Sequence, residues 1–286
     1  MQVGLAENWL AAAGGVLVGT PGDAWEHHGR YQYVVNAIVR EPDGSLVVGS
    51  GNGLWRVTAD PEDKWIQLHD ETLTEVLTVA QSDVGLVAGS PYGVSVSTTD
   101  ENGYPRWRSL TEHLRVNARF TNAILVDPAD STRWLVGTEG GVILGHDNGE
   151  TWEETDLSDT AVRSVIYHDG VYWAGSDDRG LLCSEDGRRW KSVWAEESVF
   201  AVATSGDRLI LGTERGFAVG ARDEGFSRTG PHILIRCVAV DPADPDVFVG
   251  GADPGGMWTS KDAGQSWTNT AVTPRVRNLY PPRGDA

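Results

Sequence analysis

A short motif recurs along this chain: a run of apolar residues, then glycine, then in most copies serine or threonine. Seven copies occur, and successive glycines are separated by 30, 40, 48, 38, 37 and 38 residues. Short strands repeated at a period of about 40 residues are typical of radial all-β folds, in which neighbouring units share one core. The motif glycines are Gly19, Gly49, Gly89, Gly137, Gly175, Gly212 and Gly250.

Each motif lies inside a larger unit. An apolar or alternating strand precedes it, and a loop, a glycine-led strand and a turn ending in an aromatic residue usually follow it. We therefore expect an all-β fold class, a seven-bladed β-propeller of four-stranded antiparallel blades. The complete units span approximately residues 33–69, 74–110, 119–155, 160–194, 197–230 and 233–270.

The two ends of the chain supply the seventh unit. Residues 276–282 match the first strand of a unit, but no second strand follows them. Residues 9–28 contain a second strand whose own preceding strand is weak. We expect the C-terminal strand to join the N-terminal blade, because this removes an exposed sheet edge. No linker or low-complexity segment interrupts the chain, so the sequence predicts a single domain over residues 1–286.

The turn that closes the last complete unit, Ser260–Trp267, reads Ser-x-Asp-x-Gly-x-Ser-Trp. We expect Asp262 to accept backbone hydrogen bonds and Gly264 to take a positive φ. Trp267 is large enough to fill the space between neighbouring sheets, so we interpret the octet as structural and not as a ligand loop. Related turns place Asp147, Gly149 and Trp152, and Asp186, Gly187 and Trp190, at matching positions.

With these turns, the seven glycine strands and the run Val240–Pro245, the chain resembles the Asp-box (BNR) β-propellers. That group includes sialidases, sortilin-type ectodomains, xyloglucan hydrolases and photosystem assembly factors, within the broader WD40/YVTN/BNR-like repeat class. The chain is also similar to uncharacterised β-propeller proteins of halophilic archaea. The resemblance implies the propeller fold but no particular activity, because the Asp-box occurs in enzymes and non-enzymes alike.

The composition is acidic, with 41 Asp and Glu against 23 Lys and Arg and a net charge of -18. Such a surface repels nucleic acid and anionic membranes, so we expect neither as a partner. An acid-rich composition with few lysines is typical of a salt-loving organism, and we therefore predict a halophilic protein. The acidity then reflects the habitat and not the choice of partner. We expect another protein as the partner, with a small anionic ligand as the alternative, and a monomeric propeller.

Two cysteines, Cys183 and Cys237, lie in apolar strands of different units. We expect both to be free and buried, which suits a reducing cytoplasm. The apolar run at residues 9–18 has no Lys or Arg before it, so it lacks the charged start of a signal peptide. No apolar run approaches the roughly 20 residues of a membrane-spanning helix. The sequence predicts a cytoplasmic protein.

Candidate binding residues come from positions that propellers place around the central channel. The second position of the first strand carries two amides and three arginines in different units: Asn36, Asn122, Arg163, Arg236 and Arg277. The loops after the glycine motif add Asp177, Asp178, Glu214 and Asp253. Guanidinium groups bind carboxylates and phosphates bidentately. Either these arginines bind an anion or a partner's carboxylate, or the loop acids neutralise them in a structural arrangement.

Other chemistry finds no support in the sequence. No phosphate-binding loop, His-Glu-x-x-His motif or Gly-x-Ser-x-Gly elbow is present, and the Arg-Ile-Pro segment of sialidases is absent. Adjacent His27 and His28 point to opposite faces of a strand, so we expect no metal site there. The acids are too numerous for spacing to identify a catalytic pair. We expect no cofactor, and the catalytic residues, if any exist, are unknown.

These observations favour a non-enzymatic cytoplasmic scaffold that binds a partner through the face carrying the arginines of the channel mouth. The alternative is a glycosidase-like hydrolase, or a binder of a small anion, that uses the same mouth. Arginines without acidic partners in an open pocket would favour the alternative. Arginines paired within the chain would favour the scaffold.

Overall fold

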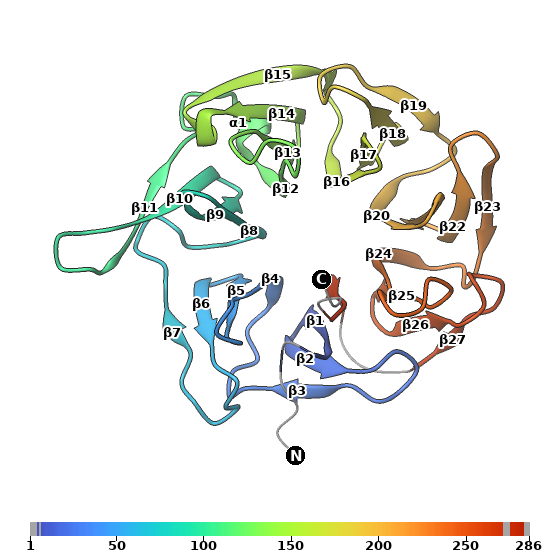
Figure 1. Ribbon diagram of the computed structural model, residues 1–286, viewed down its shortest axis with the longest axis horizontal. Helices are drawn as coiled ribbons and strands as arrows, with labels where there is room; N and C mark the ends of the chain where they lie inside the picture. The colour runs from blue at the N-terminus through green and yellow to red at the C-terminus, as the bar shows by residue number, and fades with distance from the viewer. Residues whose placement is uncertain (1–4, 6, 271–274, 283–286) are drawn as a thin grey trace. The chain divides into compact units, whose positions relative to one another are not determined.

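The computed structural model describes residue 5, residues 7–270 and residues 275–282, so both ends of the predicted 1–286 domain lie outside the described residues. Seven four-stranded antiparallel sheets follow one another along the described chain (Figure 1). The fold class is therefore a seven-bladed β-propeller, as the sequence predicts. The chain divides into two compact units.

The first unit comprises Met1–Val47, Val57–Trp65 and Val199–Ala286 and contains three complete sheets. One sheet has the order β28-β1-β2-β3, and the other two run in sequence order. The strands are β1 (Trp9–Ala13), β2 (Gly15–Gly19), β3 (Glu26–His28) and β28 (Asn278–Tyr280); β20 (Val199–Ser205), β21 (Arg208–Thr213), β22 (Gly216–Ala221) and β23 (Gly225–Thr229); and β24 (Leu234–Val240), β25 (Phe248–Asp253), β26 (Met257–Ser260) and β27 (Thr268–Asn269).

The second unit comprises Val48–Arg56 and Ile66–Ser198 and also contains three complete sheets. They are formed by β8 (Thr78–Ser82), β9 (Gly85–Ser90), β10 (Gly93–Thr99) and β11 (Pro105–Ser109); β12 (Thr121–Val126), β13 (Trp134–Thr138), β14 (Gly141–His146) and β15 (Thr151–Ser158); and β16 (Val162–His168), β17 (Val171–Ser176), β18 (Gly180–Ser184) and β19 (Lys191–Trp194). Two short helices also occur, α1 (Val116–Arg119) and the 3-10 turn η1 (Asp147–Gly149). The remaining sheet contributes residues to both units through β4 (Val35–Arg40), β5 (Leu46–Ser50), β6 (Gly53–Val57) and β7 (Ile66–Gln67).

The C-terminal strand completes the N-terminal sheet, which confirms the predicted closing unit. Strand β28 pairs with β1 in antiparallel register, with Leu10 opposite Tyr280 and Ala12 opposite Asn278. The backbone N–H of Ile38 donates to the Tyr280 hydroxyl at 2.9 Å, which ties the last strand to β4 of the same unit. The edge of β1 is therefore paired and not open to other chains.

The recurring glycine motif is explained by close sheet packing and by the turn that follows the motif. A Cβ on Gly137 would lie 2.9 Å from the Val162 side chain, so the first strand of the following sheet leaves no room for a larger residue. The hydroxyl of Thr138 donates to the carbonyl of Gly141 at 2.9 Å and accepts from the N–H of Gly140 at 3.1 Å. The motif thus combines close sheet packing with a hydroxyl that closes the turn between the second and third strands.

The two cysteines are free and buried, as the sequence predicts. Burial raises the pKa of the Cys237 thiol to about 12, so that thiol stays protonated and unreactive at neutral pH. In the described part of the chain, no helix is long and apolar enough to cross a membrane.

The turn at Ser260–Trp267 has the predicted geometry. The N–H of Ser266 donates to Asp262 at 2.8 Å, and the N–H of Gly264 donates to the Ser260 hydroxyl at 2.8 Å. Gly264 has a φ of 85°, and the Trp267 indole stacks on Phe217 with 3.6 Å between ring centroids. The indole N–H of Trp267 donates back to the Gly264 carbonyl at 3.1 Å, so the tryptophan closes the turn that precedes it.

The turn at Asp147 differs from the sequence expectation. Asp147 itself takes a positive φ of 52°, and among the described residues its carboxylate has no hydrogen-bond partner. The chain has Gly145 where the other turns have serine, so the hydroxyl that supports the turn at Ser260 is missing. The glycine and the tryptophan keep their roles, since Gly149 has a φ of 82° and the indole of Trp152 donates to the Gly149 carbonyl at 2.8 Å.

Candidate functional site

Four of the predicted channel-mouth positions are β-bulges. In β12, β16, β20 and β24 the pairing skips one residue near the start of the strand. An extra residue in one strand disrupts the ladder locally and re-aims its side chain. The repeat therefore controls the direction of these side chains through the backbone, which the residue pattern alone does not reveal. The skipped residues are Asn122, Arg163, Phe200 and Arg236.

In the second unit, Arg163 is held by two carboxylates of the same chain. Its Nε and Nη2 bond to both oxygens of Asp177, with Nε 2.9 Å from Oδ1, and its Nη1 donates to Glu139 at 2.6 Å. Asn122 donates to the same Glu139 oxygen at 3.1 Å and to the Val162 carbonyl at 3.2 Å. The hydrogen bonds from Arg163 to Asp177, together with the charges of both carboxylates, raise the pKa of the guanidinium. This cluster is neutralised within the chain.

The first unit contains a similar arrangement around Asp253. Arg236 lies 3.3 Å from one oxygen of Asp253, and Arg275 lies 3.0 Å from the other. The Arg236 guanidinium carbon lies 5.7 Å from the centroid of the Phe200 ring, which adds a cation–π contact. Arg275 was not among the predicted residues, although it stands only two residues before the predicted Arg277.

The other predicted residues take different places. Glu214 pairs with its neighbour Arg215 at 3.3 Å, and Asp178 is exposed to solvent. The backbone N–H of Arg277 donates to the Ala12 carbonyl at 2.7 Å, which anchors the segment before β28. Asn36 lies in β4 and is half-buried. That all these residues surround one mouth stays a prediction.

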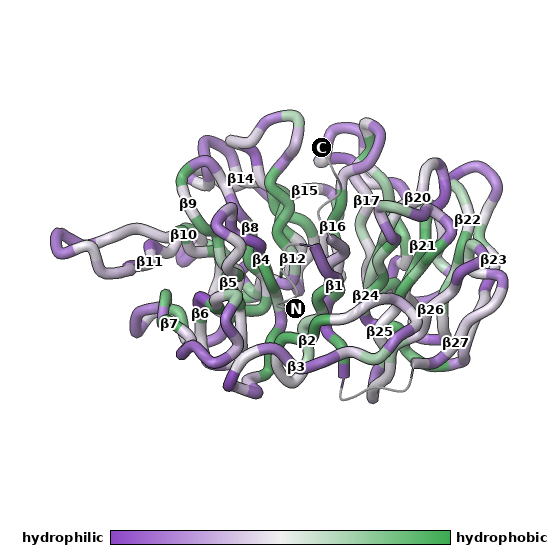
Figure 2. Tube along the Cα trace, turned by 60° about the horizontal axis from the view of Figure 1, so that its bottom comes forward, coloured by the Kyte–Doolittle hydropathy of each residue, from purple (hydrophilic) through white to green (hydrophobic). Residues whose placement is uncertain are grey.

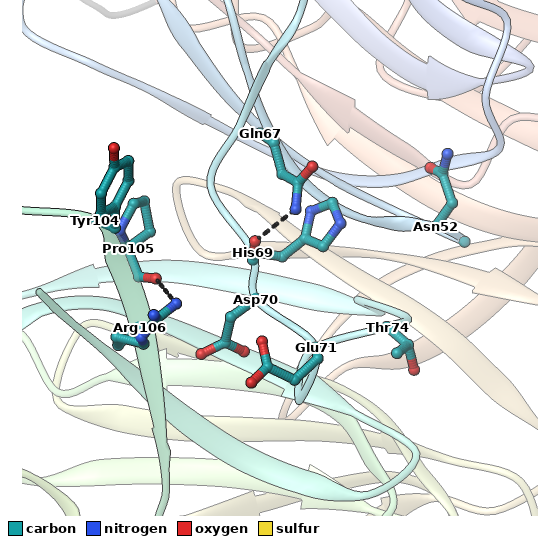
Figure 3. Close-up of a pocket in the computed structure, with 10 residues that line it drawn as sticks. Asn52, Gln67, His69, Asp70, Glu71, Thr74, Tyr104, Pro105 and Arg106 are labelled. Carbon is teal, nitrogen blue, oxygen red and sulfur yellow. Dashed lines mark hydrogen bonds between the residues drawn. The ribbon is translucent and has the colours of Figure 1, made fainter. Parts of the chain in front are cut away.

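A cavity of about 760 Å³ lies elsewhere in the second unit, beside β7 and β11 (Figure 3). It is formed by the turn at Asn52, the segment from Gln67 to Thr74 and the start of β11 at Tyr104–Arg106. In Figure 3 the carboxylates of Asp70 and Glu71 extend from one short segment toward the side on which Arg106 lies. Glu71 and the exposed phenol of Tyr104 have no side-chain partner among the described residues.

Asp70 is the most constrained polar group of this cavity. One of its oxygens accepts the Thr72 hydroxyl at 2.6 Å, and the other accepts the backbone N–H of Trp107 at 3.0 Å. Burial opposes ionisation, but these hydrogen bonds and the charge of Arg106 lower the pKa of Asp70 overall. Asp70 is therefore an ionised acceptor that covers the open edge of β11 and not a proton donor at neutral pH.

The cavity borders on the least regular part of the repeat. The hairpin between β10 and β11 extends away from the other strands of its sheet, and Figure 2 shows that its tip is hydrophilic. The glycine spacing over this unit is 48 residues, compared with 30 to 40 over the five other intervals. The insertion between Ser97 and Trp107 is visible in the sequence. It marks this unit as a departure from the repeat.

No protein-family model matches the chain, and no curated protein is similar to it by sequence. Membership of the Asp-box class and the haloarchaeal resemblance therefore stay predictions.

Solved structures share the fold at low sequence identity. The WD40 β-propeller domain of Doa1 has a TM-score of 0.67 at 14% identity, over 90% of this chain and 90% of that domain. The GH74 xyloglucanase from Xanthomonas campestris has a TM-score of 0.64 at 17% identity, over 92% of this chain. This chain spans only 47% of the xyloglucanase. The computationally designed Ika8 protein has a TM-score of 0.61 at 16% identity, over 86% of this chain and 80% of that protein. At such identities the similarity shows the fold alone.

Proposed function

We propose that this protein is a non-enzymatic scaffold that binds another protein. The observation that carries the proposal is the internal pairing of Arg163, whose guanidinium is already occupied by Asp177 and Glu139. An arginine that binds a ligand anion needs free donors, and these donors are committed to the chain. The pairing fits a structural role for the arginines, and it favours the scaffold over an anion binder or a hydrolase at the same residues.

The cavity in Figure 3 gives a hydrolase no better support. Glycoside hydrolysis requires one carboxyl group that keeps its proton near neutral pH, beside a second that is ionised. The pKa of Asp70 is lowered, and its oxygens are occupied by Thr72 and Trp107. The xyloglucanase activity of the GH74 neighbour belongs to a protein of about twice this length.

We place the partner interface on the sheet β8–β11 and its hairpin. Six large hydrophobic side chains are well exposed in the described part of the chain, and four of them lie between residues 84 and 116. All four belong to the sheet β8–β11 or to the segments joined to it, and exposed apolar and aromatic side chains are typical of protein interfaces. The four residues are Val84, Tyr92, Tyr104 and Val116.

The acidic composition argues against two classes of partner. With a net charge of -18, the scaffold repels nucleic acid and anionic lipid, so we expect neither as its partner. The proposal keeps the predicted cytoplasmic location and monomeric state. Both follow from the sequence and are open to direct measurement by fractionation and by light scattering.

The test is a quantitative pull-down from native lysate at molar KCl with three variants beside the wild type. Tyr104→Ser removes the exposed aromatic residue of the hairpin, and Val34→Ser removes an exposed apolar residue of another sheet as the matched control. The third variant changes Arg163, Arg236 and Arg277 to Ala. We expect a stoichiometric protein that is lost with Tyr104→Ser and retained with the other two variants.

Loss only in the arginine variant would keep the scaffold but move its interface to the predicted mouth. The absence of any stoichiometric partner would contradict the proposed function.

A further inference from the structure

A second cavity, of about 450 Å³, lies on β10 and β11 of the second unit and is lined by both strands and by the segment that contains α1. Its size falls within the range of roughly 300–1,000 Å³ that is typical of small-molecule sites. The side chains that line it are mostly polar, and two are aromatic. The residues that matter here are Tyr92, Ser95, Trp107, Ser109, Glu112 and Arg119.

Arg119 is the cation that lines this cavity, and among the described residues no carboxylate pairs with it. Its Nε is buried and has no hydrogen-bond partner, and its Nη1 reaches only the Glu112 carbonyl, at 3.4 Å. By contrast, ten arginines of the described chain form ion pairs. Arg119 is half-buried and has no such pair, so its guanidinium retains donors for an external oxyanion.

Two hydroxyl groups lie in the same cavity. Ser95 and Ser109 are directly opposite each other in the β10–β11 pairing, and both are half-buried. Within the described residues neither hydroxyl forms a hydrogen bond, whereas Ser97, on the same face of β10, accepts one from the N–H of Leu86. Each hydroxyl is able to donate one hydrogen bond to an oxyanion.

The carboxylate of Glu112 indicates whether the ligand of this cavity is a simple anion or a zwitterion. Its exposed carboxylate lines the cavity and has no partner in the described structure. The contact from Arg119 Nη1 to the Glu112 carbonyl places the positive group beside the residue that carries the negative one. A simple anion would meet both this carboxylate and the overall charge of -18, whereas a neutral zwitterion avoids that repulsion. The phenol of Tyr92, 66% exposed, offers an aromatic face to an ammonium group or an apolar side chain.

We propose that this cavity binds an α-amino acid in its zwitterionic form. The carboxylate accepts from Arg119 and from the hydroxyls of Ser95 and Ser109, the ammonium group donates to Glu112, and the side chain lies against Tyr92. The site shares Tyr92 with the proposed partner interface but does not involve Tyr104 or the cavity of Figure 3, and amino-acid binding is measured on the isolated chain without any partner.

The test is calorimetric titration of the full chain with each of the twenty protein amino acids, in a KCl buffer in which circular dichroism shows the folded protein. For the tightest binder, two analogues follow: the amine that lacks the carboxylate and the acid that lacks the amino group. We expect each analogue to bind about tenfold to 100-fold more weakly, the usual effect of losing a charged hydrogen-bond partner.

Variants of the protein locate the site. Arg119→Gln is expected to weaken binding by about tenfold or more. Glu112→Gln is expected to have an effect of the same size, and because Glu112 is exposed, this change is safe for folding. Arg108→Gln removes an exposed arginine that pairs with Glu150 outside the cavity, and it is expected to leave the affinity unchanged. The proposal is overturned if no amino acid binds, if either analogue binds as tightly as the amino acid, or if Glu112→Gln and Arg119→Gln both keep the wild-type affinity.

Discussion

The sheets β16–β19 and β8–β11 are built on the same repeat but use their polar residues differently. In the first, the bulged Arg163 is bound by Asp177 and Glu139, and the turn before β19 is closed by Trp190. In the second, a longer hairpin exposes Tyr104, and the neighbouring Glu71 has no partner among the described residues. Residues that the repeat requires are therefore engaged in contacts within the chain, and residues that depart from the repeat remain available for binding.

The largest expected difference concerns two aromatic residues. Trp190 packs against the core cluster around Leu182, and its indole N–H donates to the Gly187 carbonyl at 3.1 Å. Trp190→Ala is expected to lower the free energy of unfolding by about 3 kcal/mol, through lost packing and a residual cavity. Tyr104→Ala, at an exposed position, is expected to change it by no more than about 0.5 kcal/mol. Urea denaturation measures both, and equal losses would contradict the comparison.

The next difference concerns two arginines. Arg163→Met leaves Glu139 and Asp177 half-buried without their cation, and we expect a loss of about 1–2 kcal/mol, between the values for exposed and buried pairs. Arg106→Met breaks a more exposed pair with Asp100 and is expected to cost less than about 1 kcal/mol. The same denaturation experiment compares them. A larger loss of unfolding free energy for Arg106→Met than for Arg163→Met would contradict the expectation that the regular sheet depends more on its arginine.

A smaller effect on stability is expected when the pH is lowered. The backbone N–H of Arg189 is the main cause that lowers the pKa of Asp186 from its usual 3.8, with further help from Arg188 and Ser184 against the opposing effect of burial. A lowered pKa in the folded state stabilises the fold above pH about 4 and loses this contribution as the pH falls below that value. Asp186→Asn is expected to lower the melting temperature at pH 6 and to reduce its further decrease toward pH 2. Asp178→Asn, at an exposed position, serves as the control and should follow the wild type.

The smallest expected effect is a difference in how strongly salt screens the two ion pairs. At 1 M KCl, charges more than about 3 Å apart in solvent are screened, and exposed pairs are screened most. The cost of Arg106→Met is expected to vanish on going from 0.1 to 1 M KCl, and most of the cost of Arg163→Met is expected to remain. Denaturation midpoints of the two variants and the wild type at both salt concentrations measure this, and equal screening of both pairs would refute the difference in burial.

The sequence predicted the strands well because the glycine motif has a local cause. At Gly89, Gly137 and Gly212 the next sheet leaves no room for a Cβ, and the hydroxyl of a residue such as Thr138 closes the adjoining turn, so the signal recurs along the chain. The pairing of β28 with β1 was equally predictable, since one end had a first strand without a second strand after it.

The candidate site was less predictable, because side-chain direction and pairing depend on contacts distant in the sequence. The bulges at Asn122 and Arg163 arise from register and not from residue type. The turn at Asp147 has the expected spacing but lacks the serine hydroxyl that supports it at Ser260. The insertion before Trp107 was visible, but a cavity beside it requires Asp70, which stands 37 residues earlier.

The central claim is that binding belongs to the irregular sheet and not to the regular ones. A photo-activated benzophenone amino acid in place of Tyr104, and in a second protein in place of Val34, tests it directly in native lysate. Both positions are exposed and apolar, so they differ mainly in the sheet that carries them. We predict one dominant cross-linked protein from position 104 and none from position 34. The same set of cross-links from both positions, or none from position 104, would contradict the account.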